Sequence, residues 1–135
     1  MKTWIKFLIM PWTTIVIFSF LEWLVMGFLF NTNPNGWGSW ISGFVVMWFV
    51  GSTVYFSAPT PKLPLSTLYT ALLFGLFVFV DYSNSGQTTT VFGETVRHQF
   101  NLGRHIASAL GLFISVAGMH YAETEDTQST ESSTT

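Results

Sequence analysis

Long apolar stretches separated by short polar segments dominate the chain. A membrane-spanning helix needs about 20 predominantly apolar residues at a rise of about 1.5 Å per residue. Four segments approach or meet this length, and we expect spans over residues 11–30, 39–57, 64–82 and 102–121. The pattern therefore predicts an all-α membrane protein with four transmembrane helices joined by short loops.

Prolines and turn-forming residues set the predicted boundaries. Because proline resists a helix interior and suits a first turn, we expect a short interfacial segment over 3–10 and a first span that begins at Pro11. The turn formers at 31–36 make the first two helices adjacent and antiparallel, and the proline-rich connector 58–64 ends the second span. The longest loop, 83–101, has room for a short strand or an amphipathic segment at the membrane surface.

Composition supports lipid as the main solvent of the chain. Charged residues make up 9% of the sequence, against about 25% in ordinary soluble domains. With Lys and Arg together at 5, the chain offers no basic surface for nucleic acid, and with Cys at 0 it has neither disulfides nor Cys-ligated metal sites. Residues 123–135 are all acidic or Ser, Thr or Gln, so we expect this acidic tail to be disordered.

The basic residues indicate an orientation. Lys2, Lys6 and Lys62 fall on one side of the predicted membrane, and Arg97 and Arg104 fall on the other. Because positive residues are enriched on the cytoplasmic side, this distribution predicts that both termini lie on the cytoplasmic or interior side.

Glu22 is the most informative single residue. It lies near the centre of the predicted span 11–30, where an ionised carboxylate costs at least about 2.5 kcal/mol. Three interpretations follow. Glu22 is a proton or ion site, or a protonated carboxyl that hydrogen-bonds a neighbouring helix, or the partner of Arg104 or His105.

Four basic residues open the last predicted helix and form an expected interfacial cluster: Arg97, His98, Arg104 and His105. In one interpretation these side chains reach polar lipid headgroups. In another, Arg104 pairs with Asp81 or Glu94 on the same side of the membrane.

The histidines do not have the spacing of a metal site. On one helix, His98 and His105 would lie about 10 Å apart along the axis, which is too far for a shared ion. His120 is fifteen residues beyond His105, so a bis-His haem would need a second copy of the chain. We therefore expect no metal and no cofactor.

Small residues at helical spacing predict helix packing. The fourth predicted span carries them at i+4 intervals, at Gly103, Ala107, Gly111 and Ser115. The third repeats the pattern at Thr67, Ala71 and Gly75, and the second carries Gly43 and Gly51. Because small side chains let backbones approach closely, we expect the third and fourth spans to pack through these faces, within one chain or between copies.

The sequence favours a non-enzymatic role. It contains no phosphate-binding loop, no zinc-protease motif and no nucleophile elbow. We expect a structural or accessory integral membrane protein of a larger assembly, either a membrane complex or an enveloped virion, with lipid and other subunits or copies as partners. The alternatives are a homo-oligomeric proton or ion conduit or small transporter that uses Glu22, and a haem-binding electron carrier that uses His105 or His120.

Overall fold

A computed structural model describes residues 2–25, 36–91 and 93–133. Its elements are α1 (Lys2–Trp23), α2 (Gly38–Ser57), α3 (Lys62–Asn84), β1 (Thr88–Val91), β2 (Glu94–Arg97) and α4 (Leu102–Ser133). Within these residues, four helices are long and apolar enough to cross a membrane. The predicted multi-pass helical architecture is confirmed to this extent.

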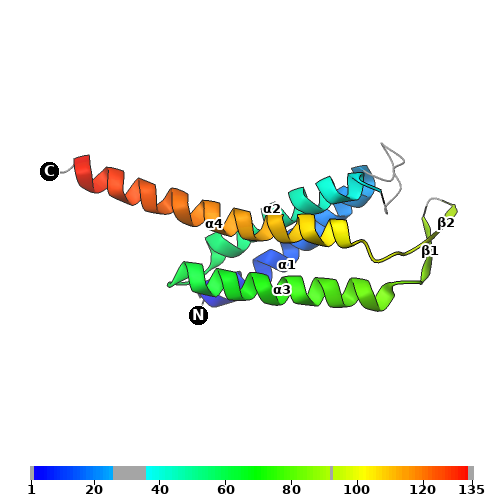
Figure 1. The fold of residues 1–135 in the computed structure, drawn as a ribbon. Helices are drawn as coiled ribbons and strands as arrows, with labels where there is room; N and C mark the ends of the chain where they lie inside the picture. The colour runs from blue at the N-terminus through cyan, green and yellow to red at the C-terminus, as the bar shows by residue number, and fades with distance from the viewer. Residues whose placement is uncertain (1, 26–35, 92, 134–135) are drawn as a thin grey trace.

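The central helix is α2. It contacts α1, α3 and α4, and its packing against α4 is the most extensive in the chain. The antiparallel hairpin β1–β2 connects α3 to α4 and supplies the short strand for which the longest loop has room. Figure 1 shows both chain ends toward the same end of the bundle, with α4 extending well beyond the other helices.

The first helix differs from its prediction. It runs without interruption through Pro11, so residues 3–10 belong to the helix and form no separate interfacial segment. Membrane helices tolerate an internal proline, and Pro11 is buried together with Phe7, which lies one turn before it. Because the helix begins at Lys2, Glu22 lies in its last turn rather than at its centre; residues 26–30 of the predicted span lie outside the described residues.

Glycines allow α2 and α4 to approach closely. A Cβ added at Gly111 would overlap the carbonyl oxygen of Phe44, and one added at Gly51 would lie 2.6 Å from the carbonyl oxygen of Leu112. At the next contact, a Cβ on Gly43 would lie 2.9 Å from Ser108 Oγ. The small-residue face of the fourth predicted span is therefore used within the chain, against α2.

The matching face of α3 makes no such contact within the chain. Thr67, Ala71 and Gly75 are exposed, and a Cβ added at Gly75 would meet no atom within 4 Å. The buried residues of α3 are Ser66, Thr70 and Leu73. Packing of the third and fourth spans through both predicted faces is thus not formed within one chain, because Gly43 and Gly51 bring α2 against α4 instead.

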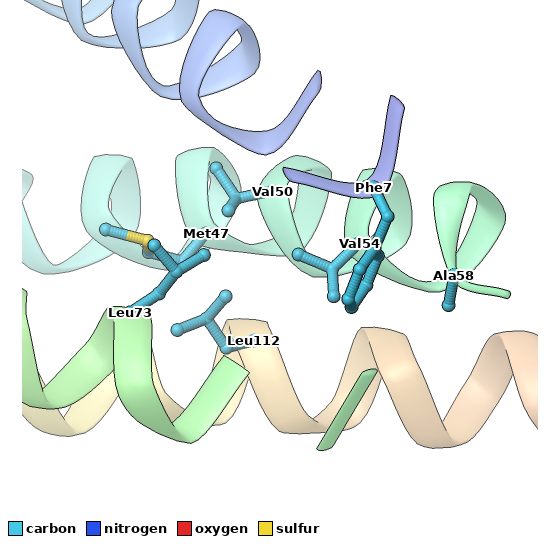
Figure 2. Packing of buried hydrophobic residues seen from close by; sticks show 7 residues of the cluster. All are labelled: Phe7, Met47, Val50, Val54, Ala58, Leu73 and Leu112. Carbon is cyan, nitrogen blue, oxygen red and sulfur yellow. The ribbon is translucent and has the colours of Figure 1, made fainter. Parts of the chain in front are cut away.

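One apolar cluster joins all four helices. Figure 2 shows its buried members, Phe7, Met47, Val50, Val54, Ala58, Leu73 and Leu112. Val50 and Val54 are fully shielded by their neighbours, with 0% exposure. This cluster is therefore apolar, and the ion pairs that connect helices lie toward the two ends of the bundle.

The acidic segment 123–135, which the sequence predicts to be disordered, is helical as far as the structure describes it. From Glu123 onward α4 continues as a helix through Ser133, and residues 134–135 lie outside the described residues. Extension of a formed helix adds one backbone hydrogen bond per residue without a new nucleation cost. The hydroxyls of Thr124 and Thr127 also bond carbonyl oxygens of the preceding turn, at 2.7 and 2.9 Å.

Enlarging Gly111 should destabilise the bundle. We expect Gly111→Ala to lower the free energy of unfolding by about 1–3 kcal/mol, because the added methyl group overlaps the α2 backbone. Thermal unfolding in detergent, followed by far-UV circular dichroism, measures the effect. Gly118→Ala on the same helix is the control, since a Cβ there meets nothing within 4 Å. Equal unfolding temperatures for the two variants would contradict the close α2–α4 contact.

Candidate functional site

Polar side chains gather in three clusters between the helices. Each cluster joins side chains from at least two helices and contains at least one carboxylate. Because an unpaired charge is costly in an apolar environment, such groups are retained where they find partners. The clusters are therefore the candidate functional sites of the chain.

The first cluster centres on Glu22. Arg104 Nη2 donates to both carboxylate oxygens of Glu22, at 3.0 and 3.1 Å, and Ser42 Oγ donates to Oε1 at 2.6 Å. The Glu22 side chain is 13% exposed and that of Arg104 is 28% exposed. Of the partners considered from sequence, the structure places Arg104, and not His105, on Glu22. This cluster connects α1, α2 and α4.

Asn101 fixes the start of α4 and so the direction of Arg104. Its Oδ1 accepts the backbone N–H of Arg104 at 3.1 Å, which is a helix N-cap interaction. The same oxygen accepts the indole N–H of Trp40 at 3.0 Å, and Asn101 Nδ2 donates to Ser39 Oγ at 3.2 Å. The first turn of α4 is thereby fastened to the first turn of α2.

The second cluster has Asp81 at its centre. His98 Nε2 lies 2.6 Å from Asp81 Oδ1, and His105 Nε2 lies 2.7 Å from Oδ2. Since an ionised carboxylate only accepts hydrogen bonds, both Nε2 atoms carry the donated protons. His105 is 4% exposed and stacks on Phe100, with ring centres 4.7 Å apart. Asp81 thus joins the end of α3 to the start of α4 and to the end of the hairpin.

The structure divides the predicted interfacial basic cluster. Arg97 lies in β2, His98 and His105 share Asp81, and Arg104 binds Glu22 rather than Asp81. His105 is buried, so this member faces the helices and not the lipid headgroups. Sequence reasoning considered Asp81 only as a partner for Arg104. The signal for the observed role is a carboxylate in the last turn of an apolar helix, with two histidines 17 and 24 residues further along the chain.

The third cluster lies toward the opposite end of the bundle and was not predicted. The Tyr55 hydroxyl, on a side chain that is 2% exposed, donates to Glu123 Oε2 at 2.6 Å. His120 Nδ1 lies 3.1 Å from the same hydroxyl. Lys62 forms an ion pair with Glu123, and its Nζ lies 5.6 Å above the centre of the Tyr55 ring. This cluster connects α2, α3 and α4.

None of the clusters has the arrangement of a metal centre. Among the residues that the structure describes, no group of three or more His, Asp or Glu side chains is placed to hold a metal ion. In the second cluster, each imidazole bonds a different carboxylate oxygen. His105 and His120 belong to separate clusters, so one copy of the chain does not bring them to a common ligand.

Comparisons of the chain with protein-family models, with curated proteins and with solved structures find no match. Function is therefore inferred from the geometry of the three clusters and of the outer surface.

Loss of His98 should loosen the hairpin. We expect His98→Ala to speed amide hydrogen exchange across residues 88–97 by about threefold, because one hydrogen bond to Asp81 is lost from a partly exposed site. The first turn of α4 should keep its protection, since His105 retains Asp81. Gln99→Ala, an exposed neighbour, is the control. Unchanged exchange in His98→Ala would show that the Asp81 contact does not hold the hairpin.

Proposed function

We propose that the chain is a non-enzymatic structural or accessory integral membrane protein that embeds in a larger membrane assembly. One observation carries the proposal: the ionisable groups of the three clusters bind one another and connect helices. Glu22 forms an ion pair with Arg104, Asp81 is bound by His98 and His105, and Glu123 forms an ion pair with Lys62. Groups used in this way stabilise a bundle, and they leave no exposed carboxylate pair or nucleophile for catalysis in the clusters.

The outer surface supports the same role. On α1, Ile9, Val16 and Phe20 are 57%, 67% and 59% exposed, and on α3 Leu68 and Phe79 are 60% and 67% exposed. Apolar side chains of this size on two long helices suit lipid chains or the helices of a partner subunit. The chain therefore presents an apolar exterior around an internally paired polar set.

The exposed small residues of α3 are the proposed docking face. Thr67, Ala71 and Gly75 lie on one side of the helix at i+4 spacing, and nothing within the described chain covers Gly75. A stripe of this kind lets a second helix approach closely. We assign it to a helix of a partner subunit or of another copy.

A large side chain on this face of α3 should weaken binding of the partner helix. We expect Ala71→Trp to reduce co-purification of partner subunits or copies from the natural membrane by about tenfold, because the indole blocks the close approach. Native mass spectrometry of the tagged chain, extracted in mild detergent, measures the stoichiometry. Leu72→Trp is the matched control, placed on the neighbouring exposed position, where the side chain is already large. Recovery of the wild-type chain as a monomer without partners would contradict the structural role.

Removal of the Glu22 charge separates the structural role from a conduit. In vesicles, we expect Glu22→Gln to leave proton flux equal to that of the wild-type chain, because Glu22 is bound by Arg104 and Ser42. The same change should lower the free energy of unfolding by about 1–3 kcal/mol, since it leaves a partly buried guanidinium without its anion. Flux through the wild-type chain that is lost in Glu22→Gln would instead establish the conduit.

A further inference from the structure

The hairpin β1–β2 lies apart from the helices that it connects. Among the described residues it is a two-stranded sheet, and its strands contact chiefly each other. Figure 1 shows the hairpin beyond the ends of the helices, with its strands running across the helix direction. An isolated two-stranded hairpin is only marginally stable in water, and each of its outer edges presents backbone groups without a partner strand. A further strand on one edge would therefore stabilise it.

The pairing within the hairpin determines which backbone groups point outward. The two strands are antiparallel, and the backbone N–H of His98 donates to the carbonyl oxygen of Gln87 at 2.8 Å. The backbone groups of Gln87 that lead into β1 therefore point toward the other strand. Because inward and outward groups alternate along an antiparallel strand, those of Thr89 also point inward, whereas those of Thr88 and Thr90 point to the outer edge.

The two outer edges of the hairpin differ in charge. The edge of β1 is formed by Thr88 and Thr90, and this strand contains neither a charged residue nor a proline. On β2 the same alternation turns the backbone groups of Thr95 and Arg97 outward, and Arg97 carries a positive charge. Charged side chains and prolines protect free edges against unwanted strand pairing. The edge of β2 has this protection, and the edge of β1 is open to strand addition.

We propose that β1 pairs with β1 of a second copy of the chain, antiparallel and about a two-fold axis at Thr89. Thr88 of each copy then exchanges backbone hydrogen bonds with Thr90 of the other copy, and the two Thr89 residues face each other between these pairs. Each cross-strand pair places threonine opposite threonine, whose hydroxyls can hydrogen-bond across the strands. Since β1 is uncharged, no like charges oppose each other. The two hairpins form one continuous sheet.

The pairing is compatible with two copies in one membrane. Thr89 lines a hollow together with Asp81 and Asn84 of α3, so the face of the sheet that carries Thr89 is turned toward the end of this helix. A two-fold axis perpendicular to the sheet keeps this face on the same side in both copies. Both helix bundles therefore lie on one side of the joined sheet, as two copies inserted in the same direction require.

This contact differs from the exposed small-residue face of α3 in its place and in its chemistry. It lies in the connection between α3 and α4, outside the apolar helices, and it consists of backbone hydrogen bonds. It does not rest on the structural role proposed above, because the copies of a conduit would pair through β1 in the same way.

Disulfide cross-linking tests the pairing, because the chain contains no cysteine. Residues that face each other between hydrogen-bonded pairs have Cα atoms about 4.5 Å apart, within the disulfide range of about 4.4–6.8 Å. In vesicles that hold only the purified full chain, we expect Thr89→Cys to give about tenfold more cross-linked dimer than Thr95→Cys, which lies on the other strand and is also exposed.

Two results of this experiment would overturn the proposal. The first is equal cross-linking of Thr89→Cys and Thr95→Cys, which would show random collision rather than a defined pair. The second is the absence of a Thr89→Cys dimer in the vesicles. A cross-link from Thr89→Cys to a different protein in the natural membrane would then assign the edge to a strand of that protein.

Proline substitution locates the pairing on β1. In the Thr89→Cys chain, we expect Thr90→Pro to reduce the dimer about tenfold, because proline removes an N–H that donates to the second copy. Thr95→Pro is the matched control, since Thr95 pairs with Thr90 in the hairpin and its N–H points to the other edge. Neither N–H takes part in the pairing of β1 with β2, so both variants should keep the hairpin. An unchanged dimer in Thr90→Pro, or an equal loss in both variants, would overturn the assignment to the β1 edge.

Discussion

The close approach of the α2 and α4 backbones is the constraint on which the rest of the bundle depends. Between helices in lipid the hydrophobic effect gives little drive for association, so contact depends on van der Waals packing and on interhelical hydrogen bonds. Gly43, Gly51 and Gly111 remove the side chains that would otherwise hold the two axes apart. Their spacing also aligns the two helices, so that Arg104 and Ser42 both donate to Glu22 while Tyr55 donates to Glu123.

The remaining helices are held at the ends of this pair. Glu22 connects α1 to α4 at one end, and Asp81 connects α3 to α4 at the same end. Lys62 connects the start of α3 to Glu123 at the other end. Since α4 supplies a polar partner in every case, its position determines where α1 and α3 lie. The outward faces of α1 and α3 carry exposed apolar side chains and take no part in these contacts.

Sequence patterns predicted the membrane-spanning helices but not which helices and side chains pack against one another. Four apolar stretches of near-membrane length are visible without any structure, because length and composition suffice for them. The small residues from Gly103 to Ser115 predict that some helix packs closely there, yet spacing on one helix does not identify its partner. The predicted first span began too late, at Pro11, whereas α1 begins at Lys2, because the cost of a proline inside a helix depends on what surrounds it. Asp81 and its two histidines were missed because a hairpin, and not a continuous helix, places His98 beside His105.

Continuation of α4 past the bundle changes how far and in which direction the chain end reaches. The helical segment from Glu123 to Ser133 covers ten residue steps of about 1.5 Å and so extends about 15 Å. A flexible coil of the same length has a similar root-mean-square span of about 17 Å, but it samples every direction. The helix is anchored at Glu123 by Lys62 and Tyr55, so the segment beyond Glu123 points in one fixed direction from the bundle. Its far end lies beyond the screening length of about 8 Å at physiological ionic strength, where charges near the bundle no longer act strongly on it. The last described turn of α4 is thus held out on a stiff helix, beyond the electrostatic reach of the charges at the base of the segment.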